Sequence, residues 1–481
     1  MSFYDCLFLS KDSAWCDFHA RHFTIQRRVS HSTASLIICC LFVLLSLIDH
    51  SVHAQVTPKP EHPASRLNGW KLGEFNDEVL KLESTKPGDG RLVLHAHDPL
   101  RVENVTGGTA RLWPGWDGTV GYSHYVLELS AQQAGEMTVR LQRIIPPEKP
   151  QPTSDEQLVT FHKRLRGRSS RAPDDRHGFG KWQSRYRTKL AWALMGGGPP
   201  QRVPLDARVI ETKDYPKFTL RRVEYRSQKD RKHVLLLSLP KDVKNAPLLL
   251  ALHGHEAPWG QADERAYTMG HPDDFIAYFG ERGWAVLQPA TLDHSLQHKD
   301  WTLQGEWTWD AMVALDYAAT TADVDMERVG VCGLSTGAHL AMNVLALDER
   351  VKAGVVGCIL STWHHYERRF RIPPHCDCGI YGQLSGVLEQ CDWAALAAPK
   401  PVMFQHGRQD AAFCPGADEK RLDLKWNTGI LPQAEYDAMF AEVERAWQLL
   451  EKPSAVKTHF HDGPHQVDNE AAWKWLNAAL E

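Results

Sequence analysis

The clearest pattern in the chain is the alternation of short apolar runs with longer amphipathic stretches from residue 218 to the C-terminus. Short apolar runs bounded by turn residues predict buried strands. They lie at 223–226, 234–239, 248–252, 285–288, 328–332, 353–360, 401–405 and 455–460. Apolar residues at helical spacing predict helices over 273–281, 307–320, 336–347, 434–450 and 470–480. Strands and helices in alternation favour an α/β fold, with a mostly parallel sheet and helices on both of its faces.

A different pattern precedes this region. Between residues 67 and 145, short β-like runs at 91–96, 123–129 and 137–145 are separated by Gly and Asp. In the last run, apolar and polar residues alternate with the period of a half-buried strand. We therefore expect a β-rich accessory region over 67–150, a basic linker and helical segment over 151–217, and the α/β domain over 218–481.

The first 66 residues have the layout of a targeting segment and a linker. Leu36 to Ile48 is an apolar run of 13 residues, broken only by Ser46, with arginines before it and small residues after it. Thirteen residues are too few to cross a bilayer easily. The layout predicts a secretory signal peptide over 1–54, followed by a polar linker over 55–66. An uncleaved signal-anchor is the alternative. We expect a secreted or periplasmic protein with no stable membrane span after signal removal.

The charge composition of the chain bears on the kind of partner that it binds. The 55 Lys and Arg residues against 59 Asp and Glu leave a formal charge of −4, so no global basic field points to nucleic acid. A basic tract over 162–189 carries ten Lys and Arg residues. It is either an anion-binding patch or a solvated face. Trp182, Tyr186 and Trp192 run through its end at near-helical spacing, and we expect them to dock this segment on the following domain.

The cysteines fall into three groups. Of the ten, four lie in the predicted signal segment. Cys332 and Cys358 stand in apolar runs and are predicted to be buried free thiols. In an oxidising compartment the others can form one or two disulfides, and the sequence leaves their pairing open. These are Cys376, Cys378, Cys391 and Cys414.

The first candidate catalytic motif is a G-x-S-x-G pattern centred on Ser335. It lies between the predicted strand 328–332 and the predicted helix 336–347. Such a serine occupies a strained turn from strand to helix, and larger residues at the flanking glycines would clash. The turn exposes the hydroxyl and points the helix N-terminus at developing negative charge. The pattern therefore predicts that Ser335 is a nucleophile.

A serine nucleophile needs a histidine base and a carboxylate that orients it. In this strand order the acid precedes the histidine, and each follows a later strand. Asp410 follows the run 401–405, and His465 lies in the last loop, which predicts them as acid and base. Two other histidines nearby, His406 and His461, are expected to be structural rather than to act as the base. Asp462 could replace Asp410 as the acid only if its loop folded back.

An acyl-transfer site also needs donors for the oxyanion. The backbone N–H of Thr336 is one candidate, because it opens the helix after the nucleophile. The second donor is expected from the loop after an early strand, and the N–H of His255 follows the run 248–252. Glu256, next in this loop, either touches substrate or is a solvated loop residue.

Taken together, these motifs are similar to those of a known superfamily of enzymes. The stretch from about residue 182 to the C-terminus resembles the α/β-hydrolase superfamily, within it the acetyl-xylan-esterase-like and dienelactone-hydrolase-like secreted esterases. The matching motifs are Leu252-His253-Gly254-His255, the segment 325–337, the segment 398–410 and Gly463-Pro464-His465. The resemblance implies the α/β-hydrolase fold, a serine carboxylic-ester hydrolase with an acyl-enzyme mechanism, no cofactor, and Ser335, His465 and Asp410 as nucleophile, base and acid. It suggests acylated carbohydrate, such as acetylated xylan, as substrate.

The segment 361–393 is expected to lie over the mouth of this site. Trp363 is predicted to stack on a sugar face, and Arg368 with its neighbouring arginines to bind an anionic glycan ester. The alternative is that these arginines form local ion pairs. A metal at His375-Cys376-Asp377-Cys378 is not expected, because zinc ligands usually come as spaced pairs.

Two rival functions remain at this point. A prolyl-oligopeptidase-type peptidase shares the fold, but it normally needs a propeller of β-blades, and residues 67–145 are too few to build one. A catalytically inactive binding protein on the same scaffold is the other, although every position of the triad is intact. The expected partner is a small-molecule or polysaccharide ester.

Overall fold

The computed structural model describes residues 56–61, 65–76, 78–95, 100–114, 124–143, 171–254, 274–290, 298, 301–363, 365–366, 384, 387–410, 414–416 and 431–481. The predicted signal peptide lies outside these residues, as do His255, Glu256, Arg368, Cys376 and Cys378. The chain separates into two units, Met1–His53 and Ala54–Glu481, and all of the described residues belong to the second unit.

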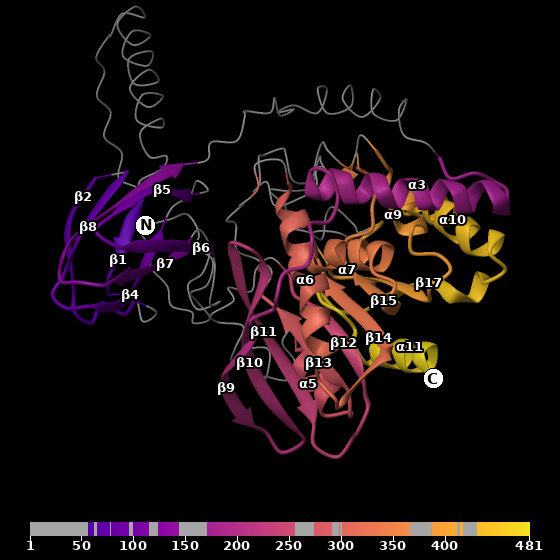
Figure 1. The fold of residues 1–481 in the computed structure, drawn as a ribbon. Helices are drawn as coiled ribbons and strands as arrows, with labels where there is room; N and C mark the ends of the chain where they lie inside the picture. The colour runs from indigo at the N-terminus through magenta and orange to yellow at the C-terminus, as the bar shows by residue number, and fades with distance from the viewer. Residues whose placement is uncertain are drawn as a thin grey trace, which may run out of the picture. The chain divides into compact units, whose positions relative to one another are not determined.

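The N-terminal β-rich region consists of two four-stranded antiparallel sheets (Figure 1). One sheet has the order β1-β4-β7-β6, with β1 Thr57–Lys59, β4 Gly88–His95, β7 His124–Ala131 and β6 Thr109–Pro114. The other has the order β2-β3-β8-β5, with β2 Trp70–Asn76, β3 Val79–Ser84, β8 Gly135–Arg143 and β5 Leu100–Thr106. Alternating residues such as Leu80, Leu82, Met137, Val139 and Leu141 are buried in one core, which both sheets share.

The α/β domain is built on a nine-stranded sheet of order β17-β16-β15-β14-β12-β13-β11-β10-β9. The strands are β9 Arg208–Asp214, β10 Phe218–Gln228, β11 Arg231–Pro240, β12 Ala246–Leu252, β13 Ala285–Pro289, β14 Val324–Leu334, β15 Val351–Gly357, β16 Val402–Gly407 and β17 Val456–His461. From β13 across to β17 all neighbours are parallel, whereas β9, β10 and β11 pair antiparallel. The prediction of a mostly parallel sheet is confirmed.

Helices cover both faces of this sheet because its central strands are apolar on both sides. In β12, Leu248 and Leu250 point into one core and Leu249 into the other. The first core receives α3 Arg176–Met195, α6 Leu303–Ala318, α7 Thr336–Leu347, α9 Gln390–Ala395 and α10 Gln433–Leu449. The second receives α5 Phe275–Gly280 and α11 Asn469–Leu480. All five predicted helices are therefore present, with ends that shift by a few residues.

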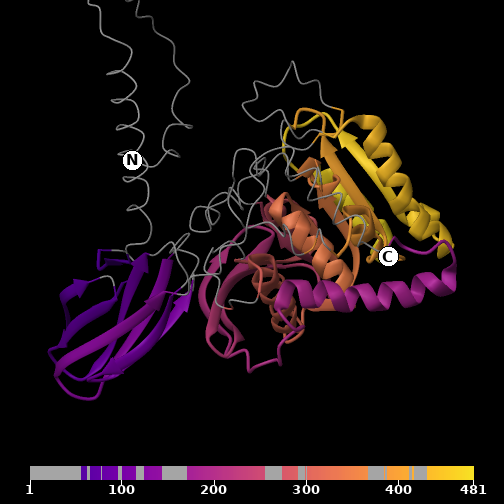
Figure 2. The same ribbon diagram turned by 90° about the horizontal axis from the view of Figure 1, so that it is seen from above.

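Helix α3, the long magenta helix of Figure 2, carries most of the predicted aromatic contacts. Trp182 and Tyr186 are buried, which confirms that they dock the helix on the α/β domain. The same prediction is wrong for Trp192, which is 61% exposed. Ten residues after Trp182, the helical turn of 100° per residue has carried Trp192 away from the buried face.

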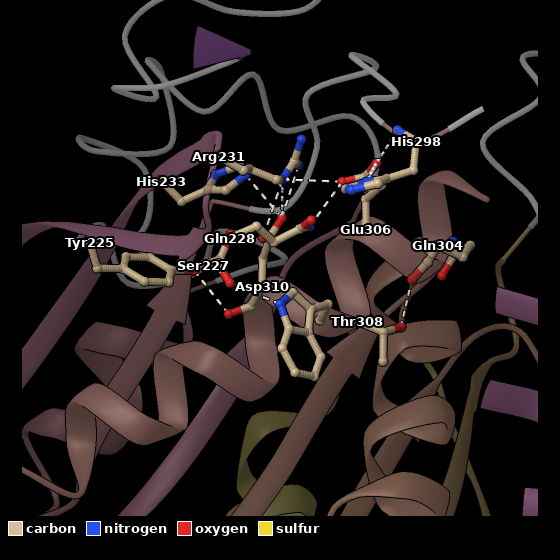
Figure 3. A network of polar contacts seen from close by, with 11 residues as sticks. Tyr225, Ser227, Gln228, Arg231, His233, His298, Gln304, Glu306, Thr308 and Asp310 are labelled. Atoms are coloured by element: carbon tan, nitrogen blue, oxygen red, sulfur yellow. Dashed lines mark hydrogen bonds and ion pairs between the residues drawn. The ribbon is translucent and has the colours of Figure 1, made fainter. Parts of the chain in front are cut away.

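A buried polar network ties the strand pair β10–β11 to the start of α6 (Figure 3). Arg231 pairs with Asp310 at 2.9 Å and with Glu306 at 3.4 Å, and all three side chains are fully buried. Nε2 of His233 lies 2.9 Å from Oδ2 of Asp310 and is a second partner of this carboxylate. Burial by itself would raise the pKa of Asp310, but the charges of Arg231 and His233 outweigh it and hold that pKa far below its ordinary value. The network fixes α6 against the sheet at the edge where the parallel strands end.

The described residues also bear on the predicted disulfides and on membrane-spanning helices. Cys332, Cys358, Cys391 and Cys414 carry free thiols, so the structure has no disulfide at Cys391 or Cys414. No helix among the described residues is both long and apolar enough to cross a membrane.

Candidate active site

The candidate nucleophile occupies a strained turn between β14 and α7. Ser335 has φ 55° and ψ −119°, a backbone conformation that costs a non-glycine residue energy. Its N–H donates to Gly357 O at 2.9 Å, which anchors the turn on the neighbouring strand β15. A Cβ on Gly333 would come closer than 3.0 Å to Gly337 O, and one on Gly337 would come as close to Leu252 O. The G-x-S-x-G pattern is thus required by close backbone packing around the serine.

The candidate acid and base are joined by a direct hydrogen bond. Asp410 follows β16, and its side chain is fully buried. Its Oδ2 lies 2.7 Å from Nδ1 of His465, which follows β17. Burial of the His465 ring opposes its charged form, but the charge and hydrogen bond of Asp410 outweigh this and raise the pKa of His465 well above its ordinary value.

The loop that carries His465 folds back across the sheet edge toward Ser335. A Cβ on Gly407 would strike Pro464 O, so the loop crosses the end of β16 in close contact. Further along, Gln466 O accepts from the Cys358 thiol at 3.4 Å, at the end of β15. Since Gly357 also holds the amide of Ser335, this loop reaches the strand end directly beside the nucleophile turn.

The competing residues have other partners. Nε2 of His461 contacts Gln466 O at 3.0 Å, and its Nδ1 accepts from Gly463 N at 3.1 Å, so this ring shapes the last loop. His406 is fully buried and contacts the hydroxyl of Tyr436 at 3.0 Å. The side chain of Asp462 is 96% exposed and lies 3.8 Å from Arg408. These positions favour Asp410 as the partner of the base.

Part of the predicted oxyanion site is described. Thr336 is the first residue of α7, so its N–H belongs to the helix end that has no partner within the helix. Gly254, after β12, packs beside the nucleophile, since a Cβ on it would lie 3.7 Å from Ser335 Cβ. His255 and Glu256 follow Gly254 outside the described residues.

The predicted sugar-stacking role of Trp363 is corrected by its burial. Trp363 is 1% exposed, and its indole N–H donates to Leu388 O at 2.6 Å. Its ring stacks on Trp393 with the centroids 5.9 Å apart. Trp363 is therefore a core residue that offers no face to a sugar. Arg368, predicted beside it, lies outside the described residues.

The position of Cys358 beside the candidate base was not predicted from the sequence. Sγ of Cys358, a ring nitrogen of His465 and a carboxylate oxygen of Asp410 all lie within 4.8 Å of one another. Burial raises the pKa of the Cys358 thiol, so the thiol form is favoured. The available signal in the sequence was that Cys358 directly follows strand β15, which ends at Gly357. A residue at the end of this strand lies at the sheet edge where the candidate base is found.

The mostly parallel sheet, with helices on both of its faces, gives the chain an α/β fold, as the sequence pattern predicts. No family model matches the chain. The chain is 28% identical over 117 residues to YtaP of Bacillus subtilis (strain 168), a provisionally assigned hydrolase, and the match covers 23% of this chain and 39% of that protein.

The solved structures that are similar to the chain include three esterases. One, provisionally assigned as an acetyl xylan esterase of Bacteroides fragilis NCTC 9343, has 16% identity and a TM-score of 0.48 over 68% of this chain and 91% of that one. The methylesterase BT1017 has 15% identity and a TM-score of 0.48 over 71% of each chain. A glucuronoyl esterase from Solibacter usitatus has 17% identity and a TM-score of 0.46 over 62% of this chain and 92% of that one.

Proposed function

We propose that this protein is a serine carboxylic-ester hydrolase that removes acyl groups from carbohydrate esters outside the cytoplasm. The observation that carries the proposal is the 2.7 Å contact between His465 Nδ1 and the buried Asp410, at the sheet edge that also presents Ser335 in a strained turn. The carbohydrate part rests on the motif resemblance, and export rests on the sequence pattern of residues 1–54.

The chemistry follows from the three roles. Ser335 Oγ attacks the ester carbonyl carbon while His465 takes the hydroxyl proton on Nε2, since Nδ1 faces Asp410. The tetrahedral intermediate expels the alcohol, which receives that proton, and the acyl group stays on Ser335. Water then attacks the acyl-enzyme with His465 again as base. The acid leaves, and the serine hydroxyl is restored.

Two backbone groups are assigned to the oxyanion. The N–H of Thr336 and the N–H of His255 would donate to the negative oxygen of each tetrahedral intermediate. The loss of a single donor of this kind typically raises the barrier by about 2.7–4 kcal/mol. Gly254 supports the second assignment, because it brings its loop into contact with Ser335.

A substrate panel tests the proposal. The purified protein is assayed on p-nitrophenyl acetate, acetylated xylan, methyl glucuronate esters and peptide amides, alongside Ser335→Ala and the matched control Ser184→Ala on helix α3. We expect release of acid from the esters, its loss in Ser335→Ala, and full activity in Ser184→Ala. Cleavage of the amides alone would replace the esterase by a peptidase. No turnover of any ester or amide would favour a binding protein.

A further inference from the structure

Cys358 has a position that the ester chemistry does not use. It follows β15 with φ 59°, a left-handed backbone conformation that is uncommon for a non-glycine residue. Its N–H is held by Gln405 O at 2.8 Å, and its thiol contacts Gln466 O at 3.4 Å. The fully buried thiol is therefore fixed toward the loop that carries His465.

Three different donor types meet at this point. The sulfur of Cys358, a ring nitrogen of His465 and a carboxylate oxygen of Asp410 lie within 4.8 Å of one another. Zinc binds such ligands at about 2.0–2.3 Å, so tetrahedral ligands stand about 3.5 Å apart. To hold an ion, the longest of these separations must shorten by about 1.3 Å, whereas Asp410 Oδ2 and His465 Nδ1, now 2.7 Å apart, must move apart where both are ligands. A thiol and an imidazole favour zinc or a similar soft cation over Mg²⁺ or Ca²⁺.

We propose that Cys358, His465 and Asp410 form an inhibitory binding site for Zn²⁺ or another thiophilic divalent cation. Two negative ligands, the Cys358 thiolate and the Asp410 carboxylate, balance the two charges of the ion, which makes the buried complex neutral. The side chain of His465 is 31% exposed, which gives the ion a route from solvent.

The proton balance of binding is simple, and no electron is transferred. Cys358 releases its thiol proton to solvent as it becomes a thiolate ligand. His465 coordinates as the neutral ring, with its one remaining proton on the nitrogen that does not face the ion, so a charged ring also releases one proton to solvent. While the ion is bound, the ring cannot accept the proton of Ser335, so hydrolysis stops. The loss of turnover rests on the proposed function, whereas the binding itself does not.

Direct binding is tested with Co²⁺ added to the full chain, because cobalt reports a thiolate ligand through a charge-transfer band in the near ultraviolet. We expect the band in the wild-type protein and in Cys391→Ser, a matched control that removes another free cysteine, in α9. We expect no band in Cys358→Ser. The proposal fails if the wild type shows no band or if Cys358→Ser keeps it, whatever the esterase activity. Thermal unfolding followed by circular dichroism verifies that each variant is folded.

Inhibition is measured separately with Zn²⁺ on p-nitrophenyl acetate turnover. Each variant is compared with its own metal-free rate, so the basal activity of Cys358→Ser does not enter the comparison. Its inhibition constant should rise by at least about tenfold, the lower end of what losing even an outer partner of a metal ligand costs. EDTA should restore the wild-type rate. Equal inhibition of both proteins would overturn the assignment of the site. A wild type without turnover that still shows the cobalt band would contradict the proposed function alone.

Discussion

The turn at Ser335 could be predicted from the sequence alone. The glycines on either side of it permit a backbone approach that any side chain would block. Their spacing is local, so it is visible in five consecutive residues. The position of Cys358 beside His465 depends instead on a loop that returns across two strands. No local pattern encodes such a contact. The burial of Trp363 was missed for the same reason, because Leu388 and Trp393 become its neighbours only in the fold.

The protonation of His465 sets the pH dependence of hydrolysis. Asp410 raises the pKa of the ring well above the ordinary 6.5, against the opposing effect of burial. Catalysis needs the neutral ring, so activity is lost as the pH falls through the raised pKa and appears above it. We expect kcat/KM on p-nitrophenyl acetate to rise along a limb centred above pH 6.5. A flat profile, or a midpoint at or below pH 6.5, would contradict the role of the Asp410–His465 pair.

The two candidate acids can be separated by matched substitutions. Asp410→Asn should reduce kcat by up to about 10⁴-fold, because an amide holds the wrong imidazole tautomer. It should also shift the pH limb toward lower values, since the charge that raises the pKa of His465 is gone. Asp462→Asn should leave kcat unchanged, because the Asp462 side chain is exposed and lies beside Arg408. A greater loss from Asp462→Asn would move the acid to that residue.

Among the strands and helices, the central strands of the α/β domain were predictable because they are buried on both faces and form apolar runs in the sequence. Helix α7 was predicted with both ends correct, since the glycine turn marks its start. Strand β9 was not predicted, and every residue in it is exposed, so it carries no apolar period. The network of Arg231, Glu306 and Asp310 was also missed, because its members lie about 80 residues apart in sequence.

The close packing of helix α7 on β12 can be tested at Gly337. A Cβ there would overlap Leu252 O, so Gly337→Ala should lower the free energy of unfolding by about 1–3 kcal/mol. Gly180→Ala in α3 is the matched control, since a Cβ there meets nothing within 4 Å. It should raise the free energy of unfolding by about 0.5–1 kcal/mol, the helix preference for Ala over Gly. Urea unfolding measures both, and equal effects would refute the packing argument.

The anchoring of α6 depends on a buried charge. Asp310→Asn removes the main counter-charge of the fully buried Arg231 and should cost about 3–5 kcal/mol of stability. Asp325→Asn removes a partly exposed carboxylate that pairs with Arg328 at 2.7 Å and should cost less than about 1 kcal/mol. The same urea titration compares them. A small loss for Asp310→Asn would mean that the network does not hold α6 to the sheet.

In the molecule as a whole, the candidate triad is assembled at one edge of the large sheet. Strands β14, β16 and β17 end there, and each is followed by one member of the candidate triad. Parallel strands have their carboxyl ends at the same edge, so residues 335, 410 and 465 follow strands that end at one edge although they are far apart in the sequence. This shared edge was predictable from the alternation of strands and helices, which indicates a parallel sheet. The accessory sheets were predicted only as β-rich, since short strands with one exposed face give no signal of how they pair.

The role of Ser335 as the nucleophile is tested most directly by locating a covalent label on the protein. A fluorophosphonate reacts with a serine that a histidine base has activated, and peptide mass spectrometry identifies the modified residue. We predict a single phosphonyl adduct on Ser335, no adduct in Ser335→Ala, and much slower labelling in His465→Ala. An adduct on any other residue with Ser335 unmodified, or undiminished labelling of Ser335→Ala, would contradict the assignment of the nucleophile and with it the proposed reaction.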